Sequence, residues 1–337
     1  MIGIGVNMNY GPVWIDLQSE KVLPQEIPLL RHHNTGGVLL FSKNFTSKQQ
    51  IIELVQSIRE LASKPILVGV DHEGGRIWRF TEGFTRPPTA KVFGELYVRD
   101  PNLAVQQLNT AGQIIAYELL NCGIDLTFAP VLDLDHGVSE VIGDRAYHSK
   151  ADIVTACAKA FIQGLAQRGM GAIGKHFPGH GGCTMDSHFS MTIDERPFAE
   201  IASQDLVPFK QLSNVLTGVM PAHVIYSAAD PLPAGFSKYW LQYILRNQIK
   251  FNGAIISDCL SMQGSGFTGK MVEGAELALL AGCDMVIATQ QTREYLLHVL
   301  NNLNWEMTIL QTERIVKLAG NFSKNNAVLQ PAGFQVA

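Results

Sequence analysis

The sequence predicts an α/β protein folded as one closed (β/α)8 barrel of the TIM type. Eight short apolar runs alternate with eight longer amphipathic stretches along the 337 residues. The apolar runs are nearly continuous in Val, Ile and Leu, as in parallel strands that are buried on both faces. Strict alternation of strand and helix is typical of doubly wound sheets and of barrels, and the number of units favours the barrel.

The elements follow one another without a break in composition. The predicted strands are residues 11–17, 36–45, 65–75, 126–135, 171–176, 217–226, 253–260 and 284–289. The predicted helices are residues 23–33, 47–63, 102–121, 150–167, 198–212, 238–249, 271–281 and 293–318. Residues 76–98 and 177–197 show no clear period and are predicted as long loops. Because no Ser/Pro-rich linker interrupts the pattern, we expect a single domain over residues 1–325 and a C-terminal tail over 326–337.

Composition and charge exclude several classes of protein. Hydrophobic residues make up 46% of the chain and charged residues 17%, which suits a packed globular core. A net charge of −4 lacks the clustered cations that nucleic acids or anionic membranes require, so neither is expected as a partner. No apolar run approaches the roughly 20 residues needed to cross a bilayer. The N-terminus lacks a basic region and a cleavage site, and the five cysteines share no C-x-x-C spacing. These features predict a cytoplasmic protein.

Polar and ionisable residues end most of the predicted strands. In a barrel the active site lies at the carboxyl ends of the strands. The residues found there are Asp16, Lys43, Asn44, Asp71, His72, Glu73, Asp133, Asp135, Lys175, His176, His223, Asp258 and Thr289. The sequence therefore predicts a polar active-site rim.

The densest local pattern is residues 174–188, GKHFPGHGGCTMDSH. Asp186 and His188 are two positions apart, which places both side chains on one face of an extended segment. A carboxylate beside an imidazole orients the ring and raises its pKa, giving a proton donor that works near neutral pH. The three glycines at 179–182 are expected to make the loop flexible and to let the backbone approach a ligand.

The same segment is open to other interpretations. His and Asp side chains at these positions also suit a divalent metal, which would make the protein a metal-dependent barrel hydrolase. The ligands in that case would be His176, His180, Asp186 and His188. A purely structural role for the loop is the third alternative.

Asp258 is a second candidate, because it directly follows a buried strand. An unpaired buried carboxylate is costly, so we expect this one at the rim, as a nucleophile or an electrostatic stabiliser. The alternative is a structural ion pair with Lys175 or an arginine. The motif VDHEGGR, with Asp71, and the motif IGDRAY, with Arg145, are weaker signals of a strand end that faces a sugar or a phosphate. Because phosphate-loop, dinucleotide-binding and GxSxG motifs are missing, no cofactor is expected.

Six motifs now occur in one order: VDHEGGRIWRF, APVLDLD, IGDRAYH, KHFPGHG, the D-S-H of 186–188, and SDCLSM. Together they resemble glycoside hydrolase family 3, and within it the bacterial single-domain β-N-acetylglucosaminidases of cell-wall recycling. The resemblance covers roughly residues 10–320. It departs from the family at His72, which stands where the family usually has Gln, at Cys259, which stands where it usually has Asp, and at residues 189–191.

The resemblance implies the roles of individual residues. Asp258 matches the catalytic nucleophile, His188 the general acid/base and Asp186 its partner. The residues that match those binding the sugar in the −1 site are Asp71, Arg79, Arg145, Lys175 and His176. The implied reaction is a two-step retaining hydrolysis without a metal or other cofactor.

The resemblance also implies a substrate. We expect an exo-acting enzyme that removes terminal β-linked GlcNAc from 1,6-anhydro-MurNAc saccharides, with or without a peptide, and that is a monomer. A non-catalytic saccharide-binding protein is a further alternative. It is disfavoured because a binding protein needs neither Asp258 nor His188.

Overall fold

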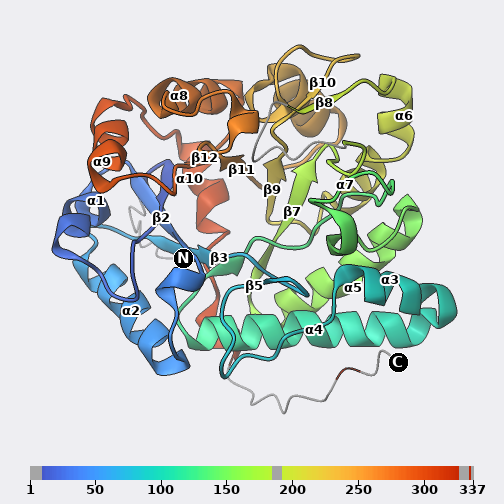
Figure 1. Cartoon of the computed structure of the whole chain (residues 1–337), viewed down its shortest axis with the longest axis horizontal. Coiled ribbons are helices and arrows are strands. Elements are labelled where there is room, and N and C mark those ends of the chain that lie inside the picture. Colours follow the sequence, from blue (N-terminus) through green and yellow to red (C-terminus); the bar gives the residue numbers. More distant parts are fainter. Residues whose placement is uncertain (1–9, 184–191, 326–333, 335–337) are drawn as a thin grey trace, which may run out of the picture.

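The computed structural model describes residues 10–183, 192–325 and 334. Within these residues, eight parallel strands close into a barrel, which confirms the predicted fold class (Figure 1). In their order around the barrel the strands are β1 (Val13–Ile15), β12 (Met285–Ile287), β11 (Ala254–Cys259), β9 (Gly218–Pro221), β7 (Gly171–Phe177), β6 (Leu126–Thr127), β3 (Leu67–Val70) and β2 (Thr35–Leu40). Side chains from neighbouring strands fill the interior, where Trp14 and Phe128 meet edge to face with ring centroids 5.4 Å apart.

Helices surround the barrel. They are α1 (Ile27–Arg31), α2 (Lys48–Leu61), α3 (Ala90–Arg99), α4 (Pro101–Asn121), α5 (Ala151–Arg168), α6 (Phe198–Ser203), α7 (Leu206–Leu212), the π-helix η5 (Tyr239–Gln248), α8 (Met271–Ala281) and α9 (Arg293–Asn302). Short 3-10 turns are η1 (Pro24–Glu26), η2 (Ser42–Asn44), η3 (Gly143–Arg145), η4 (Ala234–Phe236), η6 (Gln263–Ser265) and η7 (Phe322–Asn325). None of the helices in the described residues is long and apolar enough to cross a membrane.

Local sequence explains where these helices begin and end. The Ser47 side chain caps α2 by accepting a hydrogen bond from the Gln50 amide. Ile51, Val55 and Ile58 recur at helical spacing and bury one face of α2. A helix end is explained in the same way by glycine. Helix α5 ends at Gly169, whose φ of 92° lies in the left-handed region that glycine adopts without strain.

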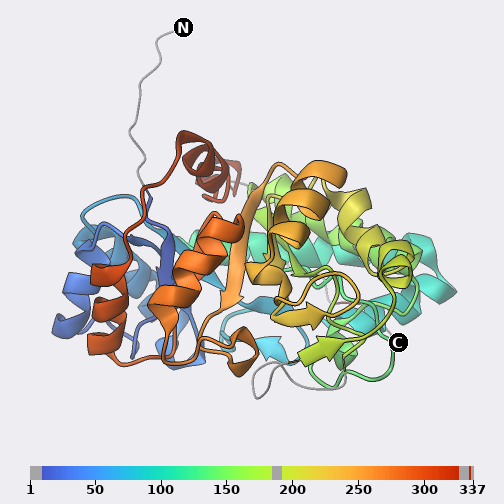
Figure 2. The ribbon, with the colours of Figure 1, turned by 90° about the horizontal axis from the view of Figure 1, so that it is seen from above.

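Helix α10 (Ile309–Val316) lies across the amino ends of the strands. Gln311 Nε2 donates to the carbonyl of Cys283 at 3.4 Å, and Arg314 pairs with Asp284 at 3.2 Å, both just before β12. Ile315 and Leu318 pack into the same cluster as the barrel-filling side chains. Figure 2 shows α10 in dark red at one end of the barrel. This helix therefore closes the amino end of the interior.

Two small sheets stand at the opposite end of the barrel. Strands β4 (His72–Gly74) and β5 (Ile77–Trp78) form an antiparallel hairpin directly after β3. Strands β8 (Thr192–Asp194) and β10 (Val224–Tyr226) pair in parallel. Both sheets appear at the far end from α10 in Figure 2, so they frame the carboxyl-end face on which the site lies.

Some predicted elements are wrong in extent. The predicted strand 126–135 has regular strand pairing only at Leu126–Thr127. The chain then continues as a buried irregular segment, which still contacts β7 through an isolated bridge between Val131 and Lys175. The predicted strand 217–226 divides into β9 and β10, which belong to different sheets. The predicted loop 76–98 contains β5 and most of α3, whose helical period is hidden by Gly94, where the helix packs directly on the Tyr147 carbonyl.

Three predicted helices are shorter or divided. Residues 23–33 hold only η1 and α1, and residues 198–212 form α6 and α7. Residues 293–318 form α9 and α10, because a second start signal lies inside the stretch: Thr308 and Gln311 make a reciprocal capping box. The predicted loop 177–197 contains β8. The predicted tail 326–337 lies outside the described residues except for Phe334, which packs edge to face on Phe93.

Candidate active site

A pocket of about 480 Å³ opens at the carboxyl end of the barrel. Six of the predicted site residues line it: Asp71, Arg79, Arg145, Lys175, His176 and Asp258. They come from β7 and β11 and from the connections that follow β3 and β6. Residues far apart in the sequence are thus brought together as predicted, because parallel strands all end on the same face.

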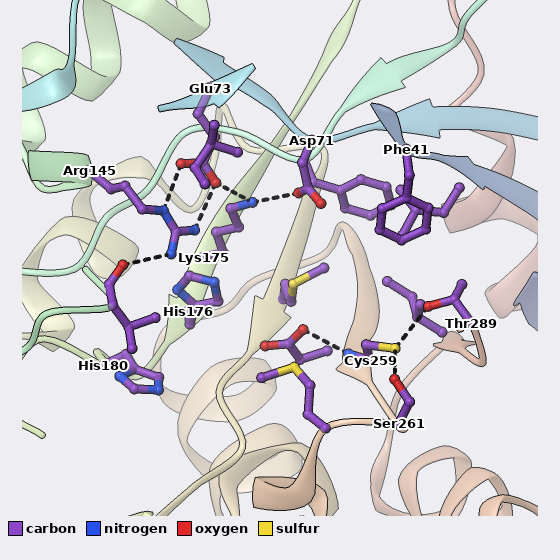
Figure 3. A pocket seen from close by; sticks show the side chains of 18 of the residues that line it. Phe41, Asp71, Glu73, Arg145, Lys175, His176, His180, Cys259, Ser261 and Thr289 are labelled. Carbon is purple, nitrogen blue, oxygen red and sulfur yellow. Dashed lines mark hydrogen bonds and ion pairs between the residues drawn. The ribbon is translucent and has the colours of Figure 1, made fainter. Parts of the chain in front are cut away.

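Glu73 is the centre of the charged wall of this pocket. The Arg145 guanidinium donates to it through Nε at 2.9 Å and through Nη2 at 2.8 Å, a two-pronged contact. Lys175 Nζ lies 2.6 Å from the same carboxylate and 2.9 Å from Asp71 Oδ1. Figure 3 shows these side chains converging on one side of the pocket. Glu73 therefore fixes the positions of both cations.

These groups keep their charges despite burial. Burial favours the neutral form of Glu73, but the charges and hydrogen bonds of Arg145 and Lys175 outweigh it and hold the pKa of Glu73 well below its ordinary value. Burial likewise acts against charge on Lys175, but Asp71 and Glu73 raise its pKa above the usual range. The wall thus presents fixed ammonium and guanidinium donors near neutral pH, which suit the hydroxyl groups of a sugar.

The β4–β5 hairpin carries Arg79 to the pocket. The ring of His72 stacks on Trp78 with centroids 3.3 Å apart, and its Nδ1 accepts from the Arg79 amide at 3.4 Å. Among the described residues, the Arg79 guanidinium makes one long ion pair, 3.7 Å, to Asp71 Oδ2 and lies over the Phe41 ring at 6.0 Å from its centroid. Arg79 is thus less tightly held than Arg145, and His72, one of the departures from the family pattern, supports the backbone that positions it.

Asp133 holds the ring of His176, near the end of β7, and the backbone of His180, just after that strand. His176 Nδ1 donates to Asp133 Oδ2 at 2.7 Å, while the amides of His176 and His180 donate to Asp133 Oδ1 at 3.1 and 2.7 Å. Burial favours the neutral acid, but His176 and His180 outweigh it, and the pKa of Asp133 is lowered. The carboxylate therefore fixes which nitrogen of His176 carries the proton.

Asp258 stands near the end of β11, on the pocket lining. Its Oδ1 accepts a hydrogen bond from the backbone amide of Cys259 at 2.7 Å. The Cys259 thiol lies 3.0 Å from Ser261 Oγ and 2.9 Å from Thr289 Oγ1. In Figure 3, Cys259, Ser261 and Thr289 stand on the side of the pocket opposite Arg145. The two walls thus differ, one charged and the other built from a thiol and hydroxyls.

The glycines after His180 pack closely against other parts of the chain, which differs from the flexible loop that the sequence predicts. A Cβ on Gly181 would collide with the Leu134 carbonyl, and one on Gly182 would collide with the Arg196 guanidinium. Arg196 is itself held by Asp194 at 2.7 Å and by Asp205 at 2.9 Å. The predicted dyad residues Asp186 and His188 lie outside the described residues.

Two residues that the sequence marks only as strand ends have specific contacts. Glu73 and Asp133 are buried acids whose partners, Arg145 and His176, are distant in the sequence, so their roles depend on the fold. The signal that pointed to them was their position directly after an apolar run. Among the described residues, no group of three or more His, Cys, Asp or Glu side chains is arranged to hold a metal ion.

Comparisons with known proteins agree with this geometry. Residues 4–318 match the model of the glycosyl hydrolase family 3 N-terminal domain. A β-hexosaminidase of Methylobacillus flagellatus is 45% identical over 93% of this chain and 90% of its own length. A β-hexosaminidase of Pasteurella multocida is 48% identical over 87% of this chain and 84% of its own. The crystal structure of NagZ from Neisseria gonorrhoeae in complex with N-trifluoroacetyl-D-glucosamine superposes with a TM-score of 0.90 at 38% identity, covering 97% of this chain and 96% of that one.

Proposed function

This chain belongs to glycosyl hydrolase family 3, and from that premise we propose that it is an exo-acting, retaining β-N-acetylglucosaminidase. The broader assignment, a glycoside hydrolase of the β-N-acetylhexosaminidase type, follows from relatives that are 43–48% identical over most of the chain. The observation that carries the finer assignment is the pocket that Asp258 lines together with the charged residues around Glu73.

The proposed substrate is a saccharide that ends in β-linked GlcNAc on 1,6-anhydro-MurNAc, with or without a peptide, as in cell-wall recycling. A pocket of about 480 Å³ lies in the range that takes a small ligand. Its inner end is closed by packed barrel side chains, among them Leu39, Phe128 and Ile287, which favours a substrate that inserts only its terminal sugar. We further propose that the enzyme works in the cytoplasm as a monomer. Residues 1–325 would form its single catalytic domain, with 326–337 as a tail.

The proposed mechanism has two displacements at the anomeric carbon. In the first, an Asp258 oxygen forms a bond to that carbon while the bond to the leaving oxygen breaks, and His188 gives its proton to the leaving oxygen. In the second, His188 takes a proton from water as the water oxygen attacks the same carbon, and the Asp258 carboxylate is released. Asp186 would hold the His188 ring.

The remaining predicted residues would hold the sugar. Lys175 and Arg145 present fixed donors, and Asp71 and Glu73 present acceptors that balance their charge. Arg79, with its single long ion pair, keeps donor capacity for the substrate. His176, oriented by Asp133, completes the same surface. These roles come from the family resemblance, and the geometry supports them because all five predicted residues line one pocket.

Turnover of para-nitrophenyl GlcNAc by wild type and by Asp258→Ala tests the proposal. We expect turnover by wild type and a loss of at least about 10³-fold in the variant, since the attacking group is gone. Asp152→Ala, which removes an exposed carboxylate on α5, is the matched control and is expected to keep full activity. An inactive wild type, or an Asp258→Ala variant that is as active as the control, contradicts the proposal.

Two further experiments separate the alternatives. A fluoro-sugar that stalls the second step should add one sugar mass to the peptide containing Asp258, which a saccharide-binding protein would not show. Activity in EDTA separates the metal-dependent hydrolase: we expect unchanged turnover. Loss of activity that is restored by a divalent cation would favour the metal-dependent mechanism instead.

A further inference from the structure

Both backbone polar groups of Cys259, the residue that follows Asp258, are hydrogen-bonded, and its carbonyl also accepts from the Met262 amide at 3.1 Å. The Cys259 amide donates to Asp258 Oδ1 at 2.7 Å, and the Cys259 carbonyl lies 3.1 Å from His223 Nε2. The Cys259 thiol contacts Ser261 and Thr289. The ends of β9, β11 and β12 therefore meet at one residue, and that residue directly contacts the carboxylate of Asp258.

His223 reaches the Cys259 carbonyl from the connection that follows the neighbouring strand, β9. It follows β9, which pairs with β11, and it is 1% exposed. Its ring stacks on Phe236 with centroids 5.3 Å apart and planes at 6°, so the plane of the ring is fixed. Phe236 in turn packs on Phe267 at 4.9 Å. The stack leaves the imidazole with little freedom to turn away from Cys259.

The protonation of His223 follows from its contact. A carbonyl oxygen only accepts hydrogen bonds, so the Nε2 that faces Cys259 must carry the proton. Nδ1 is buried and has no partner among the described residues. Burial lowers the pKa of His223, which agrees with a neutral ring that donates from Nε2 alone. His223 thus acts as a fixed donor and not as an acid or base.

We propose that His223 is a positioning residue for the nucleophile: its Nε2–H, together with the Met262 amide, holds the Cys259 carbonyl, and the amide of the same residue holds Asp258 Oδ1. The inference deepens the proposed function, because it takes Asp258 as the attacking carboxylate. His223 does not line the pocket, so its loss would not remove a contact to the bound sugar. It would let the carboxylate drift from the line of attack, which slows the chemistry and leaves binding nearly unchanged.

The test compares two substitutions of His223, one that keeps its flat ring and one that keeps its hydrogen-bond donor. His223→Phe keeps a flat ring for the Phe236 stack but has no donor. His223→Gln gives up the ring but can place an amide nitrogen near the position of Nε2. We expect His223→Phe to lower kcat about 10- to 100-fold with KM within about twofold, and His223→Gln to stay within about threefold of wild type. Phe236→Leu, which removes the stack and leaves the donor, is the control for packing.

The rate at which the fluoro-sugar forms an adduct on Asp258 is an independent measure of the first chemical step. In His223→Phe the first-order rate of adduct formation on Asp258 should fall by the same factor as kcat, while the concentration that gives half-maximal trapping stays within about twofold. If His223→Phe does not fold, His223→Asn replaces it, since its shorter amide cannot reach the Cys259 carbonyl.

Three results would overturn the inference. They are unchanged kcat and trapping rate in the folded His223→Phe or His223→Asn variant, a rise in KM with kcat unchanged, and equal losses in His223→Gln and His223→Phe. Failure of wild type to form an adduct on Asp258 would instead contradict the proposed function, so the two failures are distinguishable.

Discussion

Glu73→Gln should cost the protein a large share of its stability, because it removes the negative charge between two buried cations. The Glu73 side chain is 8% exposed, and it receives three short contacts, at 2.6, 2.8 and 2.9 Å, from Lys175 and Arg145. Breaking a buried ion pair by removing one partner costs about 3–5 kcal/mol, whereas an exposed pair contributes only about 0.2–1 kcal/mol. Lys175 keeps its 2.9 Å contact with Asp71, and the Gln amide oxygen can still accept. We therefore expect the lower end, about 3 kcal/mol.

The loss should depend on pH in a definite direction. The pKa of Glu73 is lower in the folded protein than the value of about 4.3 for an unperturbed Glu. A lowered folded-state pKa gives stability that is fully present above the unfolded pKa and is lost as pH falls toward the folded pKa. The difference between wild type and Glu73→Gln should thus be constant from about pH 6 to 7. Below about pH 4.3 it should shrink by about 1.4 kcal/mol per pH unit.

Urea unfolding of both proteins, followed by circular dichroism at several pH values, measures this difference. Asp144→Asn is the matched control, because Asp144 pairs with Arg76 at 2.8 Å with side chains 38% and 46% exposed. We expect that control to change stability by less than about 1 kcal/mol at every pH. The expectation is contradicted if Glu73→Gln lowers the free energy of unfolding no more than Asp144→Asn does, or if the decrease becomes larger as the pH falls.

Other variants probe neighbouring features. Asp133→Asn should lower kcat about 10- to 100-fold in the turnover assay, because the carboxylate that fixes the proton on His176 is gone. Asp135→Asn, which weakens a 3.4 Å surface ion pair with Lys91, is the control and should keep a kcat near that of wild type. Gly181→Ala should lower the free energy of unfolding by at least about 1–3 kcal/mol in urea, since its Cβ meets the Leu134 carbonyl; equal stability would show that the backbone yields there. Iodoacetamide at pH 7 should label the four buried thiols, Cys122, Cys157, Cys183 and Cys283, slowly in the native protein and quickly in the urea-unfolded protein. Burial keeps the reagent away and raises the thiol pKa of Cys122, for example, to about 11; fast native labelling of these four by mass spectrometry would contradict this.

The sequence predicts the barrel well because its signals are local and repeated. Apolar runs identify the strands, and caps such as Ser47 identify helix starts. Extents are less predictable where regular pairing ends inside an apolar stretch. After Thr127 the chain remains buried but pairs with β7 only at isolated points, and no apolar pattern distinguishes a regularly paired residue from an irregular one. Helix α3 is not predicted from the sequence. Its Gly94 weakens the helical pattern, and the reason for a glycine there, the close approach to the Tyr147 carbonyl, appears only in the fold.

For the site, too, the sequence predicts where residues lie better than it predicts which residues contact one another. Position after a strand was enough to predict Asp71, Lys175 and Asp258 on one surface, because topology alone brings strand ends together. Position could not assign partners. That Glu73 joins Arg145, 72 residues away, depends on the course of the connection after β6, which the sequence predicted as part of a longer strand and loop.

The packed interior of the barrel gives the pocket a blind end. Leu39, Phe128, Met220 and Ile287 line the pocket and belong to the same packed cluster as Ile315 and Leu318, so among the described residues the amino end offers no second passage for a small molecule. A reactant that enters at the carboxyl face must also leave through that face. Under the proposed mechanism, the first product therefore has to leave the pocket before water reaches the anomeric carbon bound to Asp258, so the two products are released in a fixed order. Under the same proposal, free GlcNAc should compete directly with the next substrate molecule for the pocket.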